Sequence, residues 1–203
     1  MIFKYKIHCN TENQDKFWYL PNNVAAPHTC PDNSAHSVDL ASVAVLQIGD
    51  IQEVITQYEL NDKDLKIASC ECSFDINGLA TMSLKVPGTP GTTEGRYVAG
   101  GYAFSDIWTK GDRLYKVQIV DVDNILGYGP NTVVKTYHDE EVDDANAGWR
   151  MWQTEQLGGE VEIDPIGGYG FIPAGLYLQV IFKKATNGTA SWIACDVWWG
   201  KKE

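Results

Sequence analysis

Cysteine and histidine residues near the N-terminus are of the types that bind metal ions. Cys9 and Cys30 are separated by 20 residues, His36 follows Cys30 after five more, and His8 is adjacent to Cys9. Thiolates and imidazoles are the usual Zn²⁺ ligands, and four of them complete a tetrahedral structural site. Because these residues contain no Cys-x-x-Cys pair, two other interpretations stay open. One is a Cys9–Cys30 disulfide, and the other is a pair of buried thiols that pack as small apolar groups.

Acidic residues in the second half of the chain could supply oxygen ligands for calcium. The candidates are Asp121 and Asp123 in one cluster and Asp139 and Glu141 in another. Calcium binds six to eight oxygens, and the first cluster lacks the spacing of the twelve-residue calcium loop. Solvated acidic loops are therefore the alternative interpretation.

Four tryptophans are candidates for contact with a partner or a sugar: Trp149, Trp152, Trp198 and Trp199. Exposed indole rings stack on sugars, whereas indoles that alternate with small apolar residues belong to a core. The adjacent Trp198 and Trp199 must point to opposite faces of a strand. We therefore expect one of these two side chains to lie on the outer side.

Sequence motifs of the common catalytic centres are absent from the chain. It contains no Gly-x-Ser-x-Gly, no His-Glu-x-x-His and no phosphate-binding glycine loop. Cys70, Cys72 and Cys195 lie in alternating segments and are expected to fill a core. We therefore expect no enzymatic activity. A polysaccharide hydrolase is the weaker alternative, and it would need two carboxylates that face a cleft.

Alternation of apolar and polar residues predicts a fold made of β-strands. The expected strands cover residues 1–7, 43–55 (one or two strands), 65–74, 80–86, 96–108, 114–122, 132–137, 148–154, 160–163, 176–183 and 190–199. The sequence Asp-Ile-Asn-Gly at 75–78 predicts a hairpin with a tight primed turn. Residues 9–39, which contain several Pro and Asn, are expected to form an ordered loop. The prediction is an all-β chain, with a small β/loop-rich, Cys/His-bearing module at 1–58 and a jelly-roll-like antiparallel β-sandwich at 59–203.

The charge balance excludes some classes of partner. The formal net charge is −11, with 27 acidic and 16 basic residues, so we expect no nucleic-acid partner. The sequence has no apolar run of the ~18 residues that a membrane helix requires, so we expect no membrane partner. The alternating residues 1–7 differ from a signal peptide, which predicts folding in a reducing cytoplasm.

Three N-terminal elements resemble a module of uncharacterised tailed-bacteriophage structural proteins. They are Cys9-x-Thr11-Glu12-Asn13, then Thr29-Cys30-Pro31, then His36-x-Val38-Asp39. The resemblance covers about the first fifty residues. Residues 158–163 and 170–180 are similar to the β-sandwich portion of such proteins, with less specific motifs.

This resemblance implies a non-enzymatic virion protein, assembled in the host cytoplasm, that acts as capsid decoration, head fibre, neck or tail component. The N-terminal module would dock to other virion proteins, and the sandwich would form homo-oligomers, with a trimer as the expected form. The alternative function is a carbohydrate- or receptor-binding module of the virion, with a glycan as ligand. No cofactor is firmly expected beyond a structural Zn or Ca ion.

Overall fold

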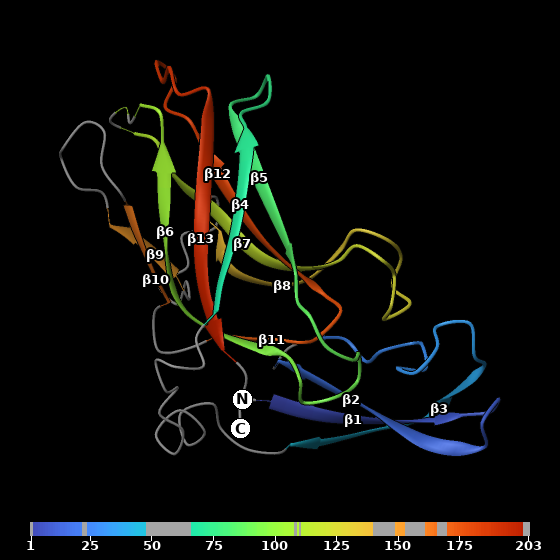
Figure 1. Ribbon diagram of the computed structural model, residues 1–203. Helices are drawn as coiled ribbons and strands as arrows, with labels where there is room; N and C mark the ends of the chain where they lie inside the picture. The colour runs from blue at the N-terminus through green and yellow to red at the C-terminus, as the bar shows by residue number, and fades with distance from the viewer. Residues whose placement is uncertain are drawn as a thin grey trace.

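A computed structural model describes residues 2–21, 24–47, 66–107, 109, 111–139, 149–152, 161–165 and 170–200 of the chain. All regular elements in these segments are β-strands, and all the strand pairs are antiparallel (Figure 1). The all-β class predicted from the sequence is therefore confirmed. The described part of the chain holds no helix with the length and apolarity that a membrane crossing requires.

The strands of the described segments form three sheets. The N-terminal sheet has the order β2-β1-β3 and consists of β1 (Ile2–Cys9), β2 (Gln14–Pro21) and β3 (Val38–Gln47). A second sheet has the order β4-β13-β6-β10-β9, with β11 also paired to β6. Its strands are β4 (Lys66–Ser73), β6 (Arg96–Ser105), β9 (Trp149–Trp152), β10 (Val161–Pro165), β11 (Gly170–Ile172) and β13 (Trp192–Gly200). The third sheet, β5-β12-β7-β8, consists of β5 (Leu79–Lys85), β7 (Arg113–Asp121), β8 (Thr132–Asp139) and β12 (Tyr177–Lys183).

The second and third sheets pack face to face and enclose the core. Along β12, Leu178, Val180 and Phe182 are buried, while the residues between them are partly exposed. The same alternation on β13 buries Ile193, Cys195 and Val197, because successive side chains of a strand point to opposite faces. Each fully buried large apolar side chain contributes about 1.5–3 kcal/mol to folding.

The N-terminal sheet lies across one end of this sandwich (Figure 1). Residues 24–31, which follow β2, run beside the loop after β7. The His28 backbone N–H donates to the Leu126 carbonyl at 2.7 Å, and the Thr29 hydroxyl donates to the Ile125 carbonyl. Tyr5, Ile7, Trp18, Leu20 and Val24 join the buried apolar cluster of the sandwich. The predicted boundary at residue 58 lies outside the described residues.

The prediction of a loop over residues 9–39 is wrong in its first part, because β2 spans Gln14–Pro21. Charged residues at its start hide the strand pattern, but Trp18 and Leu20 alternate into the core. The aromatic residues Phe17, Trp18 and Tyr19 favour a strand, because aromatic side chains pack well on a half-buried pleated surface. Strand β11 was also not predicted, since it is only three residues long.

The hairpin predicted at residues 75–78 is a turn between two sheets. Among the described residues β4 pairs with β13 and β5 pairs with β12, so the strands on either side of the turn separate. Gly78 has a positive φ of 72°, whereas a primed turn of the expected kind needs two such residues in succession. Asp75 shapes the turn by accepting the backbone N–H groups of Asn77 and Leu79, both at 2.8 Å.

Candidate metal centre

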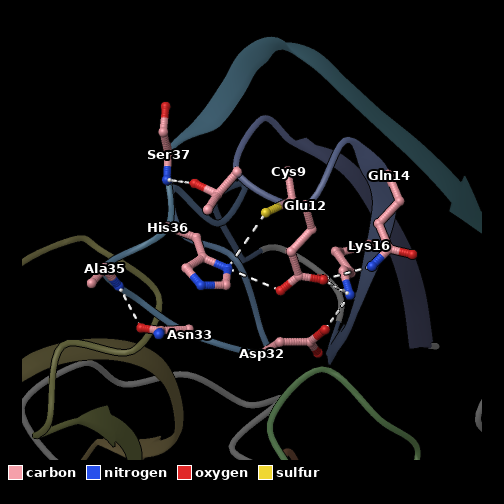
Figure 2. Close-up of polar contacts among 10 residues, drawn as sticks. Cys9, Glu12, Gln14, Lys16, Asp32, Asn33, Ala35, His36 and Ser37 are labelled. Atoms are coloured by element: carbon pink, nitrogen blue, oxygen red, sulfur yellow. Dashed lines mark hydrogen bonds and ion pairs between the residues drawn. The ribbon is translucent and has the colours of Figure 1, made fainter.

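Three chain segments bring four potential metal ligands together beside the N-terminal sheet, and Figure 2 shows three of them, Cys9, Glu12 and His36. Cys9 is the last residue of β1, Glu12 lies in the turn to β2, and Cys30 and His36 lie between β2 and β3. Their ligand atoms all lie within 4.8 Å of one another. The Asn10 backbone N–H donates to the Ser37 carbonyl at 2.8 Å and thereby joins the turn to the segment that carries His36. These four residues form a cluster that could hold a metal ion.

Two distances in the cluster lie within about 0.3 Å of those in a tetrahedral zinc site. The Cys9 Sγ and His36 Nδ1 atoms are 3.6 Å apart, and His36 Nδ1 lies 3.0 Å from Glu12 Oε1. Zinc binds sulfur at about 2.3 Å and imidazole nitrogen at about 2.0–2.1 Å, so the S to N edge of a zinc tetrahedron is about 3.6 Å. The nitrogen to oxygen edge is about 3.3 Å by the same geometry. The side chains thus stand at separations that one ion can bridge.

Cys30 sits in a tight turn that points backbone donors at its sulfur. Burial raises the pKa of the Cys30 thiol, while the backbone N–H groups of Asp32 and Asn33 lower it by donating to Sγ. The Asn33 side chain in turn accepts the Ala35 N–H at 3.0 Å, and the Asn33 carbonyl accepts the His36 N–H at 3.0 Å. This chain of local hydrogen bonds fixes His36 relative to Cys30.

Glu12 was absent from the candidate ligands predicted from the sequence. The Gln14 side-chain amide donates to its Oε2 atom at 2.6 Å, and the Lys16 amine forms an ion pair with the same oxygen. The Lys16 and Gln14 hydrogen bonds hold the pKa of the Glu12 carboxyl below its ordinary value. The sequence signal that could have identified it is its place three residues after Cys9, inside the first of the three N-terminal sequence elements.

His8, which the sequence suggested as a ligand, lies outside the cluster. Its Nδ1 atom is 3.0 Å from the Asp15 Oδ1 atom on β2. Because His8 and Cys9 are neighbours on a strand, their side chains point to opposite faces of the sheet. His28, which precedes Cys30 by two residues, also lies outside the cluster, with its exposed ring edge-on to Tyr128 at 5.2 Å between centroids.

All five cysteines are free thiols in the structure. Both sulfurs of the cluster are buried, with Cys9 at 0% and Cys30 at 1% exposure, and they are available as ligands. The other three pack against the core, as their alternating segments suggest, and Cys70 lies opposite Cys195 on the neighbouring strand. Burial raises the pKa of Cys72 to about 11, which makes this thiol a poor nucleophile at neutral pH.

The acidic residues suggested as calcium ligands do not converge in the described part of the chain. Asp121 is fully buried and accepts the Ile125 and Leu126 N–H groups, both at 2.8 Å, while Asp123 pairs with Lys85 at 2.7 Å.

The strand register also separates the two acidic clusters. Asp139 on β8 pairs with Lys116 and lies opposite it, whereas Asp121 lies opposite Thr132. That register separates Asp121 from Asp139 by five residues, or about 16 Å. Glu141 lies outside the described residues.

The tryptophan pair divides between the two faces of β13. Trp199 is buried at 6% exposure, and Trp198 is half-buried. The pairing with β6 shifts register between them. Trp149 and Trp152 lie on β9, where only the backbone is described.

Comparison of the chain with known protein families, with curated proteins and with solved structures gave no match.

Proposed function

We propose that the chain is a non-enzymatic structural component of a tailed-bacteriophage virion. The observation that carries this proposal is the convergence of the three phage-like sequence elements. Cys9 and Glu12 come from the first element, Cys30 from the second and His36 from the third, and their ligand atoms meet within 4.8 Å. Four residues spread over 28 positions of the sequence thus form one local cluster. In this proposal the cluster stabilises the N-terminal module, which docks to other virion proteins.

We also propose that the sandwich is a jelly roll, and the order of its strands supports this. Its two sheets contain the paths β4-β13-β6-β10 and β5-β12-β7-β8, and the chain crosses between the sheets after β4, β5 and β6. Eight strands arranged as two Greek keys define the jelly roll, which is common in viral capsid proteins and also in lectins. Fold alone does not define function, so this order adds to the argument from the N-terminal module.

We further propose that the ion in the cluster is zinc and that its role is structural. Two thiolates and an imidazole suit zinc and disfavour calcium, which prefers oxygen ligands. The ion would join the end of β1 to the segment between β2 and β3, and that segment also contacts the loop after β7. Structural zinc binding contributes folding free energy, about 10–16 kcal/mol in zinc-finger peptides.

A shallow groove supports glycan binding as a second candidate function. It has a volume of about 390 Å³ and lies between β2 and the loop at 90–93. Phe17 and Tyr19 supply aromatic surface there, while Asp15, Asp32 and Thr92 supply polar groups. Sugars are bound by this combination of rings and hydrogen-bonding groups. If the Tyr19→Ala variant and the unmodified protein give the same glycan-array signal, or neither binds, the groove has no such role.

Particle composition tests the assembly proposal. Mass spectrometry of purified virions from the phage that encodes this chain should detect it in fixed stoichiometry, and an antibody to it should label one location on the particle. Native mass spectrometry of the purified chain should give a homo-oligomer, with a trimer expected. A monomer that is absent from particles contradicts the proposal.

Metal content tests the zinc proposal separately. The chain purified without chelators should contain about one zinc per polypeptide by elemental analysis, as a single structural site requires. His36→Ala and Cys30→Ser should lose this zinc, while His8→Ala should keep it, because His8 faces Asp15 on the other side of the sheet. Retention of zinc in His36→Ala would exclude this cluster as the site.

A further inference from the structure

We infer that Glu12 is the fourth ligand of the metal centre, bound through Oε1 alone, and that Lys16 is the positioning residue that holds it there. The inference rests on the proposed zinc site, and it goes further by describing a closed centre of two sulfurs, one nitrogen and one oxygen. Such a centre has no open position for water or substrate. It therefore gives the site a structural role in place of a catalytic one.

The two oxygens of the Glu12 carboxylate face different partners (Figure 2). Oε2 accepts the Gln14 amide N–H at 2.6 Å and pairs with the Lys16 amine at 2.5 Å. Oε1 lies 3.0 Å from His36 Nδ1, within the group of ligand atoms. One oxygen is thus fully occupied by two donors, and the other is directed at the centre. This division is what a monodentate ligand with an ordered second shell requires.

The alternative role for a carboxylate beside a Cys₂His zinc is that of a proton acceptor from a metal-bound water. In zinc deaminases, for example, such a glutamate lies near the metal without binding it. A water between metal and carboxylate would need a hydrogen bond of about 2.7 Å to the carboxylate in addition to its own metal bond. The separation of 3.0 Å between Glu12 Oε1 and His36 Nδ1 is a direct contact, about 0.3 Å shorter than the edge expected for two ligands on one zinc ion. A small outward shift of Oε1 would bring it to the ligand position, which favours direct binding over a bridging water.

Lys16 balances the charge that this ligand set creates. Two thiolates and one carboxylate around a divalent cation leave one net negative charge, and the Lys16 amine lies against Glu12 and Asp32. The Lys16 side chain is 15% exposed, while Glu12 is 26% and Asp32 47% exposed, so solvent screens the contact with Glu12 less than the contact with Asp32. Asp32 also donates its backbone N–H to Cys30 Sγ. One amine therefore links the turn that carries Glu12 to the turn that carries Cys30.

Cobalt substitution tests the inference. Co²⁺ replaces zinc in tetrahedral sites, and its visible absorption reports both thiolate bonding and coordination number. The unmodified protein should give a thiolate-to-cobalt band and intense tetrahedral bands that azide does not change. Glu12→Ala should keep the thiolate band but become sensitive to azide, because a position opens. Glu12→Gln serves as the second variant if Glu12→Ala does not fold, and it should show the same sensitivity.

The Lys16→Met variant tests the positioning role. Its metal affinity, measured by competition with a chromophoric chelator, should fall by about tenfold or more, as for other second-shell changes. Lys16→Arg, which keeps the charge, should recover part of the affinity, and its cobalt spectrum should match the unmodified protein. Lys6→Met and Asp15→Asn are the controls, since Lys6 and Asp15 pair with each other at 3.1 Å outside the cluster. Both controls should leave affinity and spectrum unchanged.

The outcomes separate the two proposals. If the unmodified protein gives no thiolate-to-cobalt band, the zinc site itself is wrong. If the band is present but azide already alters the unmodified spectrum, or Glu12→Ala does not become azide-sensitive, the zinc site stands and Glu12 is not a ligand. If Lys16→Met binds metal as tightly as the Lys6→Met control, Lys16 has no positioning role.

Discussion

Single acidic side chains fix several loops of this molecule by accepting hydrogen bonds, and Asp106 is a clear example. The Ser191 hydroxyl donates to its Oδ2 atom at 2.5 Å, and the Ser191 N–H donates to the same carboxylate at 3.1 and 3.2 Å. The Ser191 side chain is the main cause that lowers the pKa of Asp106 below its ordinary 3.8. The carboxylate thereby joins the loop after β6 to the start of β13.

We predict that Asp106→Asn destabilises the protein at neutral pH and that the difference shrinks in acid. A group with a lowered folded pKa contributes stability above its unfolded pKa, and this contribution is lost as the pH falls through the folded pKa. Urea unfolding at pH 7 and at pH 3 measures the effect. Ser191→Ala, which removes the hydroxyl donor but keeps the Ser191 N–H, should lose only part of this pH-dependent contribution. An equal gap between the unmodified protein and Asp106→Asn at both pH values would contradict the prediction.

At the same scale, residue type alone predicts most of the candidate site. Cys9, Cys30 and His36 stand out because cysteine and histidine are rare and ligate metals. Glu12 does not, because it is one of 27 acidic residues and only the folded turn brings it to the cluster. The sequence could have excluded His8 as a ligand, because neighbouring residues of a strand point their side chains to opposite faces of the sheet.

The contact between the N-terminal sheet and the sandwich depends on two loops that carry glycine where no side chain fits. Gly127 has φ of 83°, and a Cβ there would lie 2.8 Å from Thr29 Cγ2 and 3.0 Å from His28 Cβ. Gly91 has φ of 76°, and its Cβ would collide with Pro31 and lie 2.7 Å from the Phe17 carbonyl oxygen. Each position combines a left-handed backbone with a close approach.

We predict that Gly127→Ala lowers the free energy of unfolding by about 1–3 kcal/mol, because backbone strain and overpacking add. Gly78→Ala is the matched control. It has a similar positive φ of 72°, but the nearest atom to its Cβ would be Lys184 Cβ at 3.5 Å, an ordinary contact distance. Urea unfolding should therefore show a smaller loss for the control. Equal losses would mean that strain alone acts and that the contact with residues 28–29 adds nothing.

Metal removal gives a prediction for the segment between β2 and β3. If the proposed zinc is bound, a strong chelator should lower the melting temperature, because the ion would hold Cys30 and His36 to the end of β1 and its binding would contribute to folding. Differential scanning fluorimetry with and without chelator measures the shift. Cys9→Ser should start at the lower temperature and respond little to chelator. A large chelator effect that persists in Cys9→Ser would place the metal elsewhere.

Element boundaries were predicted well where alternation is regular and poorly where charge interrupts it. The strand predicted over 176–183 matches β12 (Tyr177–Lys183) to one residue, because every second side chain enters the core. β2 was missed, since Asp15 and Lys16 precede its apolar residues. The separation of β4 from β5 after their turn could not be predicted, because local turn chemistry does not specify which sheet each strand joins.

For the whole molecule, alternation predicts the class, while the order of strands within each sheet depends on distant pairings. β13 lies between β4 and β6, and Cys195 faces Cys70 on one side and Ala103 on the other. The intervening chain contributes strands to both sheets before returning. No local pattern encodes such a pairing. The pairing results from burying the apolar faces of both sheets against each other. The layered sandwich could therefore be predicted from the sequence, whereas the order of its strands could not.

The outer strand of the N-terminal sheet gives a prediction about assembly. Among the described residues β3 pairs with β1 alone, and it carries two of the exposed large apolar side chains, Leu40 at 53% and Val45 at 50%. Its ten residues contain one charge, Asp39. Long apolar edge strands pair readily with other chains, and lysine on an edge prevents this.

We therefore expect Leu40→Lys with Val45→Lys to reduce the proposed homo-oligomer to smaller species in size-exclusion chromatography with light scattering. Ile76→Lys is the control, because Ile76 is fully exposed in the turn between β4 and β5 and lies on no edge strand. It removes a similar apolar surface and should leave the oligomer intact. If Ile76→Lys dissociates the oligomer while the β3 pair does not, assembly runs through the opposite end of the sandwich, and the prediction for β3 is wrong.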